Sequence, residues 1–256
     1  MSIDLPPLHE GLEFLSPLSD RRADQLARWV AEGLVDGGTV LDVGCGWGEL
    51  LLRIAAAAPQ ARAMGIDLDQ GRIAEACRRA QARGLMDHAA FLVADGVAAG
   101  PSPVEALLAI GATQVWGADV AEGQPLDYGS ALAAIRGRLT RGGRAVYGDA
   151  IWSHSPTRVA TAALSGRDDE FVSLAELVGL TTSHGFAVAG VREATLDEWD
   201  EFESGFTAGH ATWLAAHPGD HADAAEVRDR AAAQRDGYLH GYRGVLGMAY
   251  LQLIAV

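Results

Sequence analysis

The sequence contains no lysine, so its 20 basic side chains are all arginine, and they are outnumbered by 34 aspartate and glutamate side chains. The formal net charge is −14 and the isoelectric point is about 4.9. A chain this acidic gains no counterion-release energy from a nucleic acid backbone, and it is repelled by that backbone and by anionic lipid headgroups. We therefore expect neither a nucleic acid nor a membrane surface as a partner.

Cysteine and long apolar segments are also scarce. The two cysteines, Cys45 and Cys77, give neither a disulfide framework nor the spacing of metal ligands, so we expect no bound metal. No apolar run approaches the ~20 residues that span a bilayer. The first residues lack the basic start and apolar core of an export signal. These absences predict a cytoplasmic location for a globular chain with a mean hydropathy of +0.07.

One segment has the pattern of a buried strand, a glycine turn and a helix start. Residues 40–43 (Val-Leu-Asp-Val) suit a strand covered on both faces. Gly44, Gly46 and Gly48 allow a sharp turn whose backbone can approach a ligand. This G-x-G-x-G spacing differs from the dinucleotide fingerprint G-x-G-x-x-G, and the Glu49 that follows it would repel a pyrophosphate. The turn therefore suits a ligand that carries an amino acid moiety and no phosphate.

Two further apolar segments, residues 63–67 and 89–94, lead into acidic residues. Asp67 lies about 20 residues beyond the glycine turn, which is the spacing at which an acid accepts hydrogen bonds from ribose hydroxyls. Either Asp67 or Asp69 could instead cap the helix that follows, and we assign the ribose to Asp67 and the cap to Asp69. The third segment leads into Asp95. In a parallel sheet these acids would lie at the same edge as the glycine turn.

These features resemble the class I S-adenosylmethionine (SAM) methyltransferases, whose motif I is a hydrophobic strand followed by D-x-G-x-G-x-G, here residues 42–48. Segments 109–113, 149–152 and 242–247 are similar to a bacterial, small-molecule subgroup of that family, the type 11/25-like methyltransferases. The resemblance implies SAM as cofactor, S-adenosylhomocysteine as product and no metal. It implies that Asp95 accepts the adenine amino group. The expected cofactor-binding residues are Gly44, Cys45, Gly46, Asp67, Leu68, Asp95, Gly96 and Gly111.

The resemblance also implies an α/β fold, with a Rossmann-like, seven-stranded, mostly parallel sheet and helices on both faces. We expect one domain over residues 1–256, made of an N-terminal helical arm (1–37), a SAM-binding core (38–192), a helical insertion (193–243) and a last strand (244–256). The insertion is predicted to form helices over 196–216 and 222–242 between strands six and seven, which are usually a close hairpin in this fold. Since strand six ends on the cofactor side, we expect this insertion to be a substrate lid.

The candidates for acid–base chemistry and for substrate contact are less specific. His154, which follows the fifth strand, is the first candidate base, His210 in the insertion is the second and Asp149 is the third. An ordinary loop histidine is the competing interpretation for His154. The expected substrate-binding aromatics are Phe14, Trp116, Trp152, Trp213 and Tyr242. Most such aromatics in an insertion pack its helices together, and only a minority reach a ligand.

We therefore expect transfer of the SAM methyl group to an oxygen or nitrogen atom of a small-molecule acceptor, by a monomer or homodimer. The sequence lacks the N/D-P-P-Y/F motif of the enzymes that methylate amino groups of nucleic acids. Two alternatives stay open. One is a SAM-binding enzyme of the same fold with another reaction, such as a cyclase or a decarboxylase. The other is a non-catalytic SAM-binding protein.

Overall fold

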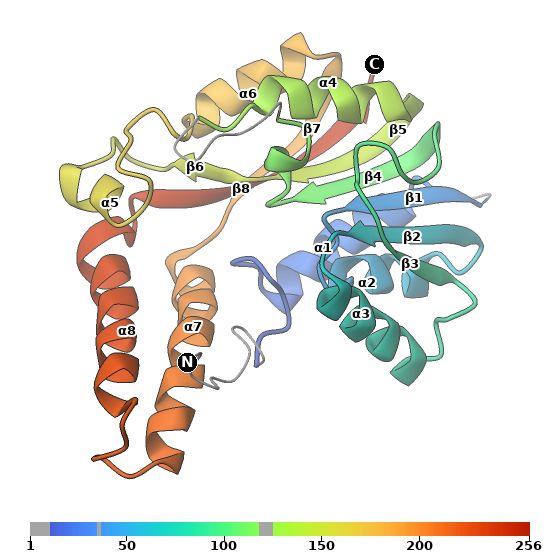
Figure 1. Ribbon diagram of the computed structural model, residues 1–256. Coiled ribbons are helices and arrows are strands. Elements are labelled where there is room, and N and C mark those ends of the chain that lie inside the picture. The colour runs from blue at the N-terminus through green and yellow to red at the C-terminus, as the bar shows by residue number, and fades with distance from the viewer. Residues whose placement is uncertain (1–10, 35–36, 118–124) are drawn as a thin grey trace.

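A twisted, mostly parallel sheet is the centre of the protein (Figure 1). The computed structural model describes residues 11–34, 37–117 and 125–256, so the first ten residues of the predicted arm lie outside the described residues. The strand order is β3-β2-β1-β4-β5-β8-β6, and β7 also pairs with β8. The pairs from β3 to β5 are parallel, whereas β8 is antiparallel to β5, β6 and β7. This arrangement confirms the predicted Rossmann-like class.

The helices and strands alternate along most of the chain. The strands are β1 Gly38–Val43, β2 Ala61–Asp67, β3 Ala89–Val93, β4 Val104–Ile110, β5 Leu139–Gly148, β6 Ala150–Trp152, β7 Phe186–Glu193 and β8 Leu246–Ala255. The helices are α1 Asp20–Ala31, α2 Glu49–Ala57, α3 Gln70–Ala82, α4 Tyr128–Arg138, α5 Arg158–Ala162, α6 Leu174–Ser183, α7 Leu196–Ala216 and α8 Ala224–Asp236, with a 3-10 turn η1 Thr113–Val115 and a π-helical turn η2 Gly237–Tyr242.

Apolar residues cover both faces of the sheet. Val40, Leu41 and Val43 of β1 are fully buried, as expected for a central parallel strand. Helices α1, α2 and α3 lie on one face, and α4 and α6 lie on the other (Figure 1). The chain direction across the sheet reverses between β1 and β4, because β2 and β3 lie on one side of β1 and β5 lies beyond β4. A crevice for ligands is expected outside the carboxyl ends of the strands at this point.

Two details differ from the sequence-based expectation. The sheet has eight strands rather than seven, because the expected fifth strand is divided at Asp149 into β5 and β6, both of which pair with β8. The second helix of the insertion begins at Ala224 rather than at residue 222, and it changes to the π-helical η2 at Gly237. The first helix of the insertion matches its predicted bounds, since Thr195 and Glu198 form a capping box at its start.

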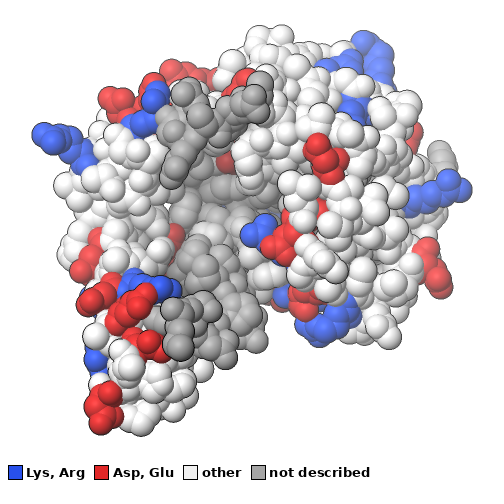
Figure 2. Space-filling model, in the orientation of Figure 1, with Lys and Arg blue, Asp and Glu red and all other residues white. Residues whose placement is uncertain are grey.

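The insertion between β7 and β8, which we call the lid (residues 193–243), projects from the sheet as an antiparallel helix pair, α7 and α8 (Figure 1). Arginine and acidic side chains are interspersed on the face shown in Figure 2, without a basic patch. None of the helices in the described ranges combines the length and apolarity needed to cross a membrane.

Candidate cofactor and active site

The glycine loop after β1 is tied to the end of β2. Gly44, Gly46 and Gly48 all have positive φ angles, between 55° and 71°, which an L-residue with a side chain rarely adopts. The backbone N–H groups of Gly44 and Cys45 both donate to the carbonyl oxygen of Ile66, at 2.8 and 3.0 Å. The loop therefore turns sharply outside the sheet, at the place where the neighbouring strand β2 ends.

The two acids after β2 have separate roles, as predicted for Asp69. Asp69 caps α3, because its Oδ1 accepts hydrogen bonds from the backbone N–H groups of Gly71 and Arg72 at 2.7 and 3.0 Å. Asp67 is 9% exposed, and its Oδ2 accepts from the backbone N–H of Gly46 at 2.9 Å. Its Oδ1 accepts from the backbone N–H of Asp69 at 2.9 Å. Each carboxylate oxygen of Asp67 retains a lone pair for a further donor.

A cavity of about 510 Å³ opens beside Asp67. Leu68, which lines it, is 73% exposed. An exposed apolar side chain of this size beside a cavity suits the face of a planar ring. Asp95 lines the same cavity and is held by a hydrogen bond from the backbone N–H of Val97 to its Oδ1, at 2.9 Å. The lining residues predicted from the sequence are Asp67, Leu68, Asp95, Gly96, Gly44 and Gly111.

A second, smaller cavity of about 120 Å³, which we call the narrow cavity, adjoins the first, since the two share Gly44, Arg72 and Gly111 in their walls. Asp42, at the carboxyl end of β1, lines this part and is 7% exposed. No hydrogen bond to its carboxylate is made by the described part of the chain. Burial, together with the charge of Asp67, raises the pKa of Asp42 to about 8. A buried carboxylate without a partner is costly unless a cation pairs with it, so this cavity suits a ligand ammonium.

Asp42 and Arg72 line the cleft although neither was predicted from the sequence to bind a ligand. Asp42 is the acid of the D-x-G-x-G-x-G pattern, and this pattern could have indicated that Asp42 lines the ligand cleft. Arg72 lines both cavities, and its guanidinium lies 4.0 Å from Asp67 and 3.8 Å from Asp69. These separations exceed hydrogen-bond length, so Arg72 is a half-exposed cation beside the cleft. Its position on the first turn of α3 was the one sequence feature that could have indicated a place beside the cleft.

A segment before α1 covers the narrow cavity. We call residues 11–19 the strap, and its Phe14, Leu15, Ser16 and Leu18 line the cavity opposite Asp42. Leu15 packs directly on the glycine loop, because a Cβ added to Gly46 would lie 2.7 Å from Leu15 Cδ1. The predicted substrate-binding residue Phe14 thus borders the cleft.

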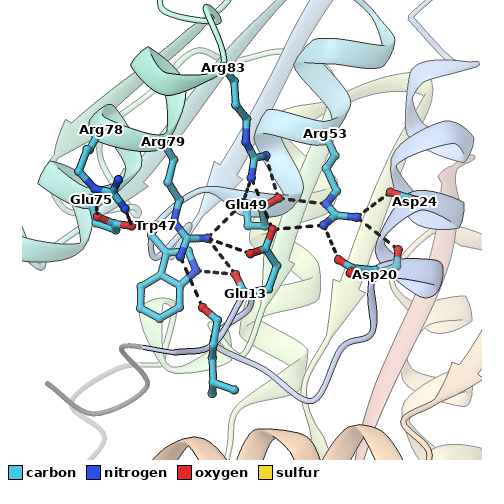
Figure 3. Close-up of polar contacts among 11 residues, drawn as sticks. Glu13, Asp20, Asp24, Trp47, Glu49, Arg53, Glu75, Arg78, Arg79 and Arg83 are labelled. Atoms are coloured by element: carbon cyan, nitrogen blue, oxygen red, sulfur yellow. Dashed lines mark hydrogen bonds and ion pairs between the residues drawn. The ribbon is translucent and has the colours of Figure 1, made fainter. Parts of the chain in front are cut away.

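Buried charges fix the strap to the core around Glu49, the first residue of α2 (Figure 3). Glu49 is 3% exposed and pairs with Arg53, Arg79 and Arg83, at 3.1, 3.1 and 2.7 Å. Burial raises the pKa of Glu49, but hydrogen bonds from Arg83 and the other partners outweigh this effect, so the net shift is downward. Glu13 of the strap completes the cluster through ion pairs with Arg53 and Arg83, at 3.3 and 3.4 Å.

Comparison with known proteins agrees with this geometry. The family model for a methyltransferase domain matches residues 40–143. A SAM-dependent methyltransferase from Geobacter sulfurreducens, solved with S-adenosylhomocysteine, is 26% identical, with a TM-score of 0.81 over 97% of this chain and 96% of that one. A SAM-dependent methyltransferase from Thiobacillus denitrificans, also solved with S-adenosylhomocysteine, is 26% identical, with a TM-score of 0.81 over 99% and 100%. The chain thus resembles the methyltransferase domain over residues 40–143 and has the fold of these SAM-dependent methyltransferases over nearly its whole length.

Two other proteins are similar to this chain. The uncharacterized protein YjhP of Escherichia coli is 27% identical over 222 residues, which are 86% of this chain and 85% of YjhP. The [4+2]-cyclase SpnF is 23% identical, with a TM-score of 0.63 over 92% of this chain and 81% of that one. The similarity to SpnF concerns the fold alone.

The cleft fits the SAM cofactor of this methyltransferase family. Its wide part offers the apolar Leu68 and the acids Asp67 and Asp95 to an adenosine, and its narrow part offers the unpartnered carboxylate of Asp42 to an ammonium. No group of three or more His, Cys, Asp or Glu side chains that could hold a metal ion is found among the residues described above. The residues that line the cleft therefore suit S-adenosylmethionine.

The three candidate bases lie in different surroundings, and none lines the two cavities. Asp149 is 5% exposed and accepts hydrogen bonds from the backbone N–H groups of Thr113 and Ala150, at 3.0 and 2.8 Å. Burial raises its pKa, against the opposing effect of the hydrogen bonds from Thr113. These bonds hold the loop after β4. His154 is exposed, with its Nδ1 2.9 Å from the carbonyl oxygen of Gly244, and His210 is buried in α7.

The remaining predicted aromatics have packing partners. Trp152 donates from Nε1 to the carbonyl oxygen of Asp168 at 2.9 Å, and Trp116 is half-buried against the core. Trp213 stacks on His217, with ring centroids 4.0 Å apart, between the two lid helices. Tyr242 donates to Glu203 Oε1 at 2.8 Å. Their contact with a substrate stays a prediction, and these contacts favour the packing role.

Proposed function

We propose that this methyltransferase moves the SAM methyl group to an oxygen or nitrogen atom of a small-molecule acceptor and releases S-adenosylhomocysteine. One observation carries the proposal: two adjoining cavities bring the buried Asp42, which has no hydrogen-bond partner among the described residues, together with Asp67 and the exposed Leu68. We also propose that the protein works in the cytoplasm as a monomer or homodimer. Its acceptor is neither a nucleic acid nor a membrane lipid surface, since a net charge of −14 repels both.

The chain binds and orients the cofactor, which supplies a methyl group already activated on a sulfonium. Asp42 pairs with the cofactor ammonium, Asp67 accepts from the ribose hydroxyls, and Asp95 accepts from the adenine amino group. Leu68 covers one face of the adenine ring. The strap excludes water from the narrow part of the cleft and keeps the acceptor in line with the methyl group, which is the main source of rate enhancement in such a displacement.

Proton removal from the acceptor is the remaining task of the chain. For a hydroxyl acceptor, a base accelerates the reaction by about 10²–10⁴-fold, whereas a neutral amine can react by proximity alone. His154 remains the first candidate. If its Nδ1–H donates to the carbonyl oxygen of Gly244, its Nε2 keeps a free lone pair for a proton. His210 is the second candidate, and Asp149 is the third, because its carboxylate is already used by two backbone N–H groups.

Formation of S-adenosylhomocysteine, measured by mass spectrometry across a panel of small hydroxyl and amine compounds, tests the proposal. We expect at least one acceptor to give stoichiometric S-adenosylhomocysteine and a product heavier by one methylene unit. With that acceptor, His154→Ala is expected to leave SAM affinity unchanged and to slow turnover by about 10²-fold. Unaltered turnover would exclude His154 as the base.

A second function is supported by the fold shared with the [4+2]-cyclase SpnF. In that case the cleft binds SAM while another reaction takes place under the lid, and SAM is recovered unchanged after substrate conversion. A non-catalytic SAM-binding protein would bind SAM and convert no compound. Quantifying SAM and S-adenosylhomocysteine together with substrate consumption separates these alternatives from methyl transfer.

A further inference from the structure

The strap is fastened to the core at its first residues. The Trp47 indole Nε1 donates to the carbonyl oxygen of Glu13 at 2.7 Å (Figure 3). The Arg79 guanidinium donates to the same carbonyl oxygen at 3.1 Å and to that of Leu12 at 3.4 Å, while lying 4.8 Å from the centre of the Trp47 ring. These contacts come from the glycine loop and α3, so this end of the strap moves with the cofactor-binding core.

The other end of the strap is fastened to the lid through Glu198. This glutamate of α7 is 5% exposed, and its Oε1 accepts from the backbone N–H and the hydroxyl of Ser19, at 3.1 and 2.6 Å. Arg22 binds the same carboxylate with both Nε and Nη2, each at 2.8 Å. Burial raises the pKa of Glu198, yet the bonds from Arg22 and Ser19 outweigh burial and lower it to about 2. The carboxylate is therefore charged at neutral pH.

Glu198 also belongs to the start of the lid helix. Its Oε2 accepts from the backbone N–H of Thr195 at 2.8 Å, as the second half of the capping box of α7. About two turns further along the same helix face, Gly205 lies against the strap, because a Cβ added there would be 2.5 Å from Leu12 Cδ1. The first part of α7 and the strap are thus packed as one unit.

Between its two attachments the strap forms a wall of the narrow cavity through Phe14, Leu15, Ser16 and Leu18. Movement of this wall would therefore alter the access of the cofactor's amino acid part to the cavity. We propose that Glu198 is a positioning residue that couples the lid to the cofactor cleft: it holds the strap over the methionine part of SAM, and displacement of α7 releases the strap. This inference rests on SAM binding in the cleft and is independent of the acceptor.

Exchange of S-adenosylhomocysteine in the full-length protein tests the coupling. Glu198→Gln keeps the side-chain shape and one acceptor oxygen but removes the charge that binds Arg22. We expect the association and dissociation rates, measured by stopped-flow binding and by a chase with excess SAM, both to rise about tenfold, a size typical of coupling between sites. The dissociation constant is expected to change less than either rate, since both rates report opening of the same wall.

Two control variants separate coupling from loss of a helix cap. Glu176→Gln changes the corresponding residue in the capping box of α6, which Ser173 begins and which the strap does not contact. Thr195→Ala removes the hydroxyl of the α7 capping box, while the hydrogen bonds from Ser19 and Arg22 to Glu198 are retained. Both controls are expected to keep the exchange rates of the parent protein within about twofold, well below the tenfold coupling effect.

A variant on the strap side guards against a folding defect in α7. Ser19→Ala removes the hydroxyl bonded to Glu198 without changing the lid, and it should accelerate exchange in the same direction by a smaller factor. The coupling is overturned if Glu198→Gln exchanges the ligand at the same rate as Glu176→Gln. It is also overturned if Glu198→Gln misfolds and Ser19→Ala exchanges the ligand at the rate of the parent protein. Methyl transfer could fail in every assay without affecting this result, because the readout is ligand exchange alone.

Discussion

The backbone N–H of Gly46 donates a 2.9 Å hydrogen bond to the carboxylate of Asp67, so the acid at the end of β2 holds the glycine loop that follows β1. The same carboxylate faces the wide part of the cleft. Asp67 therefore has two functions that a single substitution removes together: it shapes the loop, and it offers charge-assisted acceptors to the ribose hydroxyls.

The first prediction concerns this acid. Asp67→Ala is expected to lower SAM affinity by more than tenfold in calorimetric titration, because the ribose loses two charge-assisted hydrogen bonds and the loop loses its anchor. Asp69→Ala is the matched control, since Asp69 caps α3 and is exposed. It should weaken α3 by about 1 kcal/mol and leave SAM affinity within about threefold. Equal losses in the two variants would refute the separation of roles.

The second prediction follows from the raised pKa of Asp42. In the folded protein this pKa is about 8, against 3.8 for the unperturbed group. Between these values the folded state binds one more proton than the unfolded state, so the free energy of unfolding falls as pH rises, by up to about 1.4 kcal/mol per unit. Asp149, whose pKa is also raised by burial, adds to the same slope. Urea unfolding between pH 5 and pH 8 should show the decline, and Asp42→Asn should flatten it.

The third prediction is that the Asp42 carboxyl makes SAM affinity depend on pH. A cofactor ammonium pairs with the ionised form of Asp42, so below pH 8 binding must displace a proton. SAM affinity is therefore expected to rise between pH 6 and pH 8 by up to about tenfold per unit. Titrations in buffers of different ionisation enthalpy should detect proton release at pH 7. An identical pH dependence in Asp42→Asn would mean that another group is responsible.

The fourth prediction concerns the buried Glu49. Glu49→Ala leaves three arginines around an empty site, and breaking a buried ion pair in this way costs about 3–5 kcal/mol of unfolding free energy. Glu75→Ala removes a more exposed glutamate that pairs with Arg78 and Arg79, and it should lower the unfolding free energy by about 1 kcal/mol or less. Denaturant unfolding of both variants checks the contrast. Comparable losses would argue against Glu49 as the centre of the cluster.

The sequence predicted the local elements of the site because local chemistry specifies them. The apolar run of β1, the positive-φ glycines after it and the cap at Asp69 each depend on residues within one turn or strand. The bounds of α7 were also predictable, since Thr195 and Glu198 form its capping box. The existence of the cleft followed from the position of these elements at the carboxyl edge of a parallel sheet.

Other features depend on contacts between distant segments and could not be predicted. Glu49 was interpreted only as an acid that excludes phosphate, whereas its arginine partners come from α2 and α3 and meet the strap in three dimensions. Asp149 was a candidate base, but hydrogen bonds from the loop after β4 determine its surroundings. The division of β5 and β6 at this residue depends in turn on their pairing with β8, about a hundred residues later in the chain.

A crystal structure of the complex with S-adenosylhomocysteine tests the central claim most directly. We predict electron density for the adenosine in the wide part of the cleft, with ribose hydroxyls bonded to Asp67 and the adenine ring on Leu68. We also predict the ligand ammonium within hydrogen-bond distance of Asp42, beneath Phe14 and Leu15 of the strap. Density for the ligand outside this cleft, or an ammonium that does not reach Asp42, would contradict this claim.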